Sequence, residues 1–321
     1  MRRALLAIIV VLTVSAPLAQ GEGPTDEARM TLRQQVLRLI NQDRAASGLS
    51  PVELDPESCA IADTYCEQQV RNRTTGHYTL DGYAPYMRYS FAGGNDGISE
   101  NAAAWSANYT FSDRAVFDMA RRSEEAMVRE RAPHDGHRRT ILDPAATHVG
   151  IGLAWDGGEF RMTQEFVRRY VTWTRPLPRA AGLHEPITAS AKPAAGYRVE
   201  AISVHHEAIP VTLTARAANA IGSYSLPDAR RDYLPRLKTT VRSRYDGTFQ
   251  VVREEYSDGR RGDFSVADDG GFSFAVPFTD GPGIYTVVVW VTRKGETTPI
   301  AASNISVRVD APAYSTFAGT R

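Results

Sequence analysis

The stretch "DGHRRTILDPAATHVGIGLAW", residues 135–155, decides the fold of the N-terminal half of the chain. Its first part carries the apolar pair Ile141-Leu142 four positions after His137, a spacing that predicts a short helix with the pair facing the core. Asp135 can cap this helix, which places His137 in the first turn. Arg138-Arg139 then fall on the outer side, so the basic character of the stretch is local.

The second part of the stretch predicts a β-hairpin. Val149, Ile151 and Leu153 alternate with other residues, as in a strand with one buried face. The turn residues 156–158, Asp-Gly-Gly, follow at once, and "EFRMTQEFV", residues 159–167, returns as the partner strand.

Helices surround this hairpin in the sequence. The stretch 31–55 places Leu32, Val36, Leu39 and Ile40 on one helical face, and Gly48 ends that helix. A second helix begins near Asp55, and a third is expected from Ser112 to Arg129. Helices flanking a small antiparallel sheet indicate an α+β sandwich.

The chain has two cysteines, Cys59 and Cys66, both on the expected second helix. Asp55 is a suitable N-cap there and Pro56 a suitable first residue. Seven helical residues separate the two Cα atoms by roughly 10 Å, whereas a disulfide needs less than about 7 Å. We therefore expect two buried free thiols and no intrachain disulfide.

The N-terminus indicates export. Residues 1–21, "MRRALLAIIVVLTVSAPLAQG", combine a basic start, a short apolar run and a small-residue cleavage site, as in a secretory signal peptide. Beyond this leader no segment is apolar enough to span a bilayer, so no integral membrane segment is expected in the mature chain. Without Arg2 and Arg3 the chain has 35 basic and 37 acidic residues. Such a near-neutral protein is a poor candidate for binding nucleic acid.

The C-terminal half has a different pattern. Residues 174–195 are rich in proline and alanine and predict a semi-extended, exposed linker. Residues 196–310 contain alternating runs between turn signals, which favour an antiparallel, immunoglobulin-like β-sandwich. These runs are "YRVEAISV", "PVTLTARAA", "TFQVVREEY", "GFSFAVPF", "GIYTVVVWVTR" and "NISVRV". We expect the two halves to fold independently, with at most a modest interface.

Four motifs in the N-terminal half, in order, resemble the CAP family of cysteine-rich secretory proteins, venom antigens and plant pathogenesis-related proteins. They are "LRLINQDRAASGLSPVELD", "GHYTLDG", "GISENAA" and "DGHRRTILDPAATHVGIGLAW", and "RMTQEFV" matches the family's last strand. The spacing is close to that of bacterial members. The resemblance covers residues 30–173 and implies an α-β-α sandwich, with the C-terminal β domain outside it.

The resemblance also implies a cleft lined by two histidines and two glutamates. It places His77, Glu100 and His137 in this cleft, from "GHY", "SEN" and "GHRRTIL". Glu130 is the expected fourth group, although Met127 stands where the family has tryptophan. Glu124 and Glu125 remain alternatives for that acid.

Imidazole and carboxylate groups suit two kinds of chemistry. They can coordinate zinc or another divalent metal, for which His77, His137 and Glu100 are the candidate ligands, or a glutamate can orient a histidine that acts as a general base. His134 is more simply a loop residue. Of the remaining motifs, Arg-Gly-Asp at residues 261–263 is expected to form a turn, and "HHE" at residues 205–207 to end a strand.

Two functions follow as hypotheses. The first is a secreted, non-enzymatic module that binds a small molecule, a lipid, a peptide or a glycan such as a cell-surface polymer in the cleft. The alternative is a metal-assisted hydrolase, resembling a protease, that uses His77 or His137 as base and Glu100 to orient it. The sequence contains no HExxH or Gly-x-Ser-x-Gly motif, and this favours the binding hypothesis.

Overall fold

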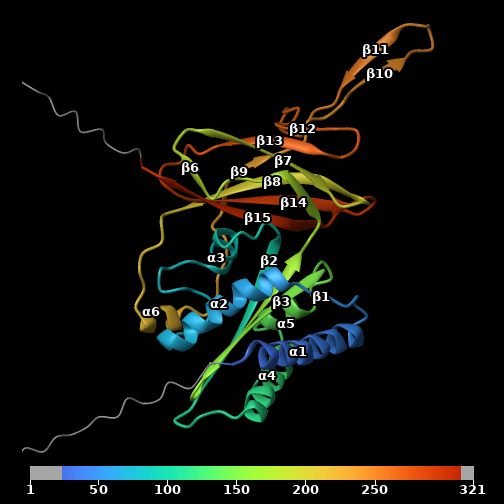
Figure 1. Ribbon diagram of the computed structural model, residues 1–321. Coiled ribbons are helices and arrows are strands. Elements are labelled where there is room, and N and C mark those ends of the chain that lie inside the picture. The colour runs from blue at the N-terminus through green and yellow to red at the C-terminus, as the bar shows by residue number, and fades with distance from the viewer. Residues whose placement is uncertain (1–23, 312–321) are drawn as a thin grey trace, which may run out of the picture.

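The computed structural model describes residues 24–311. The expected signal peptide, residues 1–21, lies outside these residues. A half that contains most of the helices lies below a half built mainly of strands (Figure 1). In the described part of the chain, no helix is both long enough and apolar enough to span a bilayer.

A four-stranded sheet forms the centre of the N-terminal half. Its strands are β1 (Glu53–Leu54), β2 (Gly97–Ser106), β3 (His148–Asp156) and β4 (Glu159–Arg168), in the spatial order β1-β3-β4-β2. The β3–β4 hairpin matches the sequence prediction, and β1 adds a short parallel pairing to β3. The order leaves β2 at one edge of the sheet, which determines where the candidate site lies.

Helices cover both faces of this sheet. On one face, α1 (Asp26–Ala46), α4 (Asp113–Val128) and α5 (Gly136–Ile141) share an apolar core with β3 and β4. On the other face lie α2 (Pro56–Asn72) and α3 (Pro85–Phe91). The expected α-β-α sandwich is confirmed. The first core includes Leu32, Val36, Ile40, Val116, Met119, Ile141, Val149, Ile151, Leu153, Phe160 and Phe166.

Two glycines of β3 allow α2 to approach the sheet closely. The buried apolar residues of β3 face α1 and α4, so the alternate residues Gly150 and Gly152 face α2. A Cβ atom at Gly152 would lie 2.3 Å from the backbone carbon of Ala62, and one at Gly150 would lie 2.4 Å from Cβ of Ser58. The glycines in "HVGIGLAW" therefore serve helix–sheet packing.

Both thiols lie buried and unpaired on α2, as predicted. The Sγ of Cys59 accepts a hydrogen bond of 3.2 Å from the amide of Ile151, and Cys66 bonds to Thr163. Burial raises the pKa of Cys59 to about 11 and that of Cys66 to about 12. Thiols that stay protonated at neutral pH are poor nucleophiles, so they serve the core.

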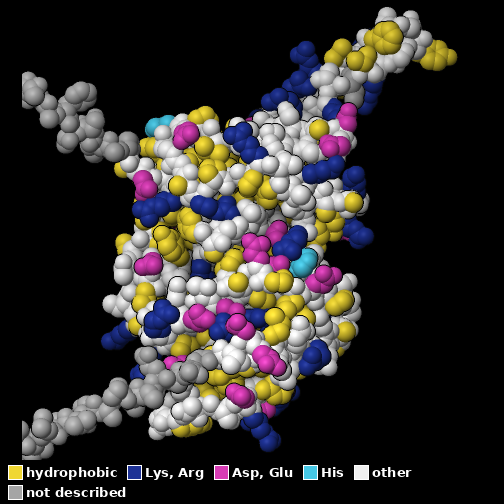
Figure 2. Space-filling view, viewed as in Figure 1, with side chains coloured by type: hydrophobic (Ala, Val, Ile, Leu, Met, Phe, Trp, Pro, Cys, Tyr) yellow, Lys and Arg dark blue, Asp and Glu magenta, His cyan; other side chains and the backbone are white. Residues whose placement is uncertain are grey.

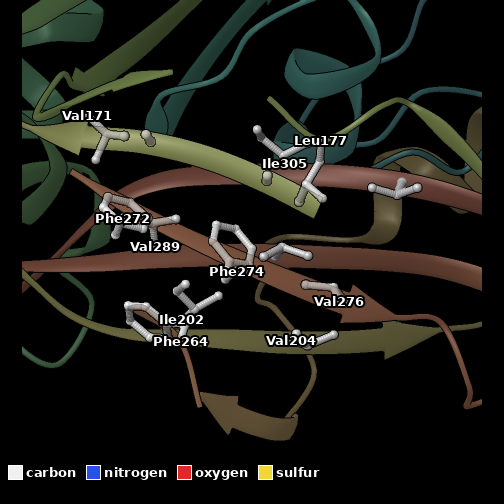
Figure 3. Packing of buried hydrophobic residues seen from close by; sticks show 14 of the residues in the cluster. Val171, Leu177, Ile202, Val204, Phe264, Phe272, Phe274, Val276, Val289 and Ile305 are labelled. Atoms are coloured by element: carbon white, nitrogen blue, oxygen red, sulfur yellow. The ribbon is translucent and has the colours of Figure 1, made fainter. Parts of the chain in front are cut away.

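The C-terminal half is a sandwich of two sheets, as predicted. One sheet has the order β12-β13-β7-β5 and the other β6-β15-β14-β8-β9, and only the pairing of β6 with β15 is parallel among them. Phe272 and Phe274 of one sheet pack with Ile202, Val289 and Ile305 of the other (Figure 3). The strands are β5 (Val171–Arg175), β6 (Ala180–Gly182), β7 (Pro186–Pro193), β8 (Tyr197–Glu207), β9 (Ala229–Tyr233), β12 (Ser265–Val266), β13 (Phe272–Pro277), β14 (Gly283–Arg293) and β15 (Pro299–Asp310).

The prediction of a linker over residues 174–195 was wrong. This segment supplies the end of β5 and all of β6 and β7, and β7 lies between β13 and β5. Of its four prolines, Pro176 and Pro178 lie between β5 and β6, and Pro186 and Pro193 stand at the two ends of β7, where a missing amide is tolerated. The buried positions between them are Ala189 and Ala191, whose small side chains give a weak hydrophobic alternation.

The prediction of a strand over "PVTLTARAA" was also wrong. Residues 208–228 form a connection between β8 and β9 that reaches the N-terminal half, and we call it the crossing segment. The amide of Leu213 bonds to the carbonyl of Leu80 at 2.6 Å. A short helix, α6 (Ala215–Ala220), follows with Thr214 as its N-cap, and the Asn219 side chain accepts a bond from the amide of Thr75.

The halves are joined by buried hydrogen bonds, which the expectation of a modest interface underestimated. The amide of Ile98 donates to Oδ1 of Asn304 at 2.9 Å, and the amide of Ser306 donates to Oγ of Ser90 at 2.7 Å. Arg179, from the supposed linker, donates to the carbonyl of Gly94 at 2.8 Å. The sandwich therefore shares a polar interface with the edge of the first sheet.

A two-stranded hairpin leaves the sandwich. Strands β10 (Thr239–Ser243) and β11 (Phe249–Arg253) pair only with each other, and they project from the body at the upper right of Figure 1.

Candidate functional site

The first element of the site is a buried pair, His77 and Glu100. His77 follows α2 in a loop, and Glu100 lies on β2. Their atoms Nδ1 and Oε1 are 2.9 Å apart. The Glu100 carboxylate also accepts from Arg88 of α3, so it is already shared between an imidazole and a guanidinium.

Arg88 serves a second carboxylate as well. Glu165 of β4 lies directly opposite Glu100 in the strand register, and Arg88 donates to it at 3.4 Å. Burial raises the pKa of Glu165, the Arg88 charge acts against this, and the neighbouring Glu100 charge adds to it. The guanidinium also stacks on the ring of Tyr65, 3.6 Å from its centroid. Arg88 therefore holds two neighbouring carboxylates in one buried cluster.

The second element is the pair His137 and Glu130. Nδ1 of His137 lies 2.6 Å from Oε1 of Glu130. The other carboxylate oxygen accepts from the backbone amides of His137 and Arg138, at 2.9 and 3.3 Å. Partial burial acts to raise the pKa of Glu130, but the hydrogen bonds from the His137 ring and the two amides outweigh it and lower the pKa.

Glu130 therefore caps α5, a role that the sequence had suggested for Asp135. The Asp135 side chain makes no capping bond and instead pairs with Arg139 at 3.3 Å. That expectation was wrong because a residue five positions earlier folds back onto the same amides. Ile141 is fully buried, as predicted.

The two pairs lie on either side of the edge strand β2. Successive strand residues point to opposite faces of a sheet. Glu100 faces α2 and α3 with His77, whereas its neighbour Asn101 donates to the carbonyl of His137 at 3.2 Å on the α4–α5 side. The histidines thus form two separate His–Glu pairs rather than one four-residue cluster.

The alternative acids occupy other environments. Glu124 is buried on α4 and accepts from Gln164, and its burial raises its pKa to about 7. Glu125 forms an ion pair with Arg121 on the same helix. Of the three candidates, Glu130 is the one that contacts His137.

Both pairs border one hollow of about 960 Å³. His134 is exposed at its rim, on the loop before α5. Most of the lining residues are polar or charged, while polar and apolar atoms share the lining surface about equally. It includes His77, Ser99, Glu100, Asn101, Glu130, His134, His137, Arg138, Arg139, Thr140, Asp143, Ser223 and Tyr224.

Tyr224 is a site residue that the sequence did not reveal. It belongs to the crossing segment, and its ring packs edge-on against the His77 ring with centroids 4.9 Å apart. Its hydroxyl oxygen accepts a bond of 2.6 Å from the amide of Glu100. Burial, followed by the nearby Glu100 charge, raises the pKa of Tyr224, so the phenol stays protonated. It lies in "GSYSLP", whose local pattern predicts only a loop.

The arrangement does not fit a metal ion held by His77, His137 and Glu100. Among residues 24–311, no three His, Cys, Asp or Glu side chains gather closely enough to hold one. Glu100 is bound by His77 and Arg88, and the guanidinium adds a positive charge beside any cation placed there. Strand geometry keeps His137 on the other side of β2.

Two other sequence motifs have structural roles. The "HHE" motif ends β8, where His205 is buried and bonds to the carbonyl of Pro227, and Glu207 accepts from Tyr86. The Arg-Gly-Asp motif forms a turn packed on residues 234–236, with Gly262 at φ 95° and Asp263 accepting from the amide of Leu234.

Comparisons with known proteins find similarity over the N-terminal half of the chain. The family model of the CAP domain, the cysteine-rich secretory protein family, matches residues 37–166. Protein YkwD of Bacillus subtilis is 24% identical over 135 residues, which are 42% of this chain and 46% of that protein. A crystal structure of a Bacillus anthracis extracellular protein containing an SCP domain is 20% identical, with a TM-score of 0.34 over 46% of this chain and 45% of the other. The chain thus spans less than half of either relative, and residues 37–166 form a CAP domain.

Proposed function

We propose that this protein is an exported binding module whose CAP-domain hollow holds a hydrophilic ligand, such as a glycan or peptide fragment of a cell-surface polymer. The observation that carries the proposal is the placement of two His–Glu pairs around one hollow of about 960 Å³. Ligand sites commonly have volumes of about 300–1,000 Å³. The leader-like residues 1–21 and the family's secretory character support export.

The lining favours a polar ligand over a lipid tail. Glu130 and Glu100 already fix Nδ1 of each histidine, so the opposite ring nitrogens are the atoms suited to a ligand. Arg138 and Arg139 add donors that match sugar hydroxyl, peptide carbonyl and carboxylate oxygens. An acyl chain would instead desolvate these groups without replacing their hydrogen bonds.

The alternative, a hydrolase, draws support from the same His–Glu pairs. In that function a histidine would take a proton from a water molecule while its glutamate partner holds the imidazolium. Glu100 is less suited to this role, because its carboxylate charge is already paired with the Arg88 guanidinium. The ligand set that a metal-assisted reaction needs is not assembled by the described residues.

Calorimetric titration with soluble peptidoglycan fragments, which carry both glycan and peptide, tests the binding proposal. A medium-chain fatty acid tests lipid binding, and a fluorogenic casein substrate tests protease activity. We expect fragment binding that is lost in His137→Ala and kept in Tyr109→Ser, an exposed site outside the hollow. Fatty-acid binding alone would contradict the polar ligand, and chelator-sensitive casein cleavage lost in His137→Ala would favour the hydrolase.

A further inference from the structure

The hairpin formed by β10 and β11 concentrates exposed apolar side chains. Of the eight large hydrophobic residues that are exposed in the described part of the chain, four lie on it: Val241, Tyr245, Phe249 and Val251. Tyr245 is fully exposed and Phe249 is 74% exposed. In Figure 2 hydrophobic side chains gather toward the outer end of this arm, away from the body.

The strand register gathers apolar side chains on one face. Val241 pairs with Val251, and Ser243 pairs with Phe249, two residues further along each strand. Residues two apart on a strand share a face, and cross-strand partners share it too. Arg242 therefore points to the opposite face of the hairpin, next to Gln250.

Such an arm is poorly stabilised on its own. A two-stranded ribbon is marginal in water unless its apolar face is covered, and clustered exposed apolar side chains mark an interaction surface. Within the described residues, β10 and β11 pair only with each other. None of the described strands therefore covers this face, which is open to a partner surface.

Charge indicates what kind of surface this is. The hairpin carries Arg242, Arg244 and Arg253, all exposed, against a single acidic residue, Asp246. The Asp246 carboxylate is occupied by the amide and hydroxyl of Thr248, at 2.9 and 2.6 Å. Arg253 pairs with Thr239 and so shares the face of Val251 and Phe249. Exposed rings with an arginine on the same face match the interface of an anionic bilayer, where rings lie at headgroup depth and arginines reach the phosphates.

We propose that the β10–β11 hairpin docks the protein on an anionic lipid membrane, with its apolar face in the headgroup region. A polyanionic polymer would pair with the arginines but leave Phe249 and Tyr245 in water. A second copy of the chain would bring arms of the same positive charge together. An anionic membrane can both bury the aromatic rings and pair with the arginines. Docking there would give the sandwich a role independent of the CAP-domain hollow.

Vesicle sedimentation of the chain from residue 22 onward tests this. We expect binding to vesicles of phosphatidylcholine with one-third phosphatidylglycerol, and much weaker binding to phosphatidylcholine alone. Tyr245→Ser with Phe249→Ser should weaken binding about tenfold. Arg253→Gln, on the apolar face, should weaken it about fivefold, and Arg242→Gln, on the opposite face, should weaken it less. Tyr109→Ser, which changes another exposed aromatic residue on the other half, should bind as the wild type does.

A direct probe of insertion is Phe249→Trp, whose emission should shift to the blue with anionic vesicles and be quenched by brominated lipid. Absence of wild-type binding, or serine variants that bind unchanged, would overturn the proposal. So would a concentration-dependent dimer in solution that the serine variants abolish, because the covering surface would then be a second copy.

Discussion

The backbone amide of Glu100 donates a hydrogen bond of 2.6 Å to the hydroxyl oxygen of Tyr224, a residue 124 positions later. The amide of Ile98, two residues earlier on the same edge strand, is bound by the side chain of Asn304. The C-terminal half thus protects part of the edge of β2, which an unpaired strand needs. It also supplies one wall of the hollow, so the candidate site belongs to both halves.

The Tyr224→Phe variant should keep the ring on His77 and lose the bond to the Glu100 amide. We expect faster hydrogen exchange at Glu100, corresponding to about 1 kcal/mol of lost protection. Tyr285→Phe is the matched control, since its hydroxyl accepts a similar bond of 2.7 Å from the amide of Asp280, far along the second half. Unchanged exchange at Glu100 in Tyr224→Phe would show that the contact does not exist in solution.

A fragment of residues 22–175 should be less stable than the same region in the whole chain. In the fragment, Ser90, Ile98 and Arg168 lose their hydrogen-bond partners in the C-terminal half. Each lost bond should lower the free energy of unfolding by about 0.5–1.5 kcal/mol. In the whole chain, Asn304→Ala should reproduce part of this loss, whereas Ser273→Ala on the exposed outer face should not. Thermal unfolding measures both. A fragment that melts at the temperature of the intact CAP domain would restore the expectation of independent halves.

The Gly152→Ala variant should destabilise the CAP domain by about 3 kcal/mol, because the new methyl group would overlap the α2 backbone. Denaturant unfolding gives the magnitude. Gly136→Ala is the control, since it has an unstrained φ and no heavy atom within 4 Å of the added Cβ. Equal stability of the two variants would mean that α2 packs further from β3 than described.

Glu124 should make stability depend on pH. Its pKa is raised from the ordinary value of 4.5 to about 7 by burial, so between these values the folded state binds more protons than the unfolded state. Stability therefore falls as pH rises from about 4.5 to 7, by on the order of 3 kcal/mol at most. Glu124→Gln should reduce this slope, and Glu125→Gln, at a half-exposed position of α4, should leave it. Glu165, whose pKa burial also raises, should supply a slope that remains. Unfolding curves at pH 5 and pH 8 give the comparison, and a slope unchanged in Glu124→Gln would contradict the contribution of Glu124.

Periodicity predicted the elements whose own residues carry the signal. The β3–β4 hairpin, α4 and the buried thiols of α2 follow from local alternation, helical spacing and capping by Asp55. The strands of 174–195 were missed because the buried positions of β7 are the small residues Ala189 and Ala191. Alanine alternating with serine and lysine gives little of the apolar–polar contrast by which a strand is predicted.

The sequence predicted four residues that line the hollow but not how they are arranged. The motifs around His77, Glu100 and His137 gave the members, yet they suggested one cluster. Glu100 and Asn101 lie on opposite faces of β2, and each face carries one His–Glu pair. Both faces border one hollow because β2 is the edge strand of its sheet. Tyr224 and Arg88 act through contacts between distant segments, and no local pattern encodes them.

Histidine-detected NMR of the whole chain, titrated with soluble peptidoglycan fragments, tests the central claim most directly. If the two His–Glu pairs line one ligand site, the ring resonances of His77 and His137 should shift together and give one dissociation constant. His205, buried in the sandwich, should not move. Shifts at only one of the two histidines, or different constants for each, would contradict a single cleft around β2.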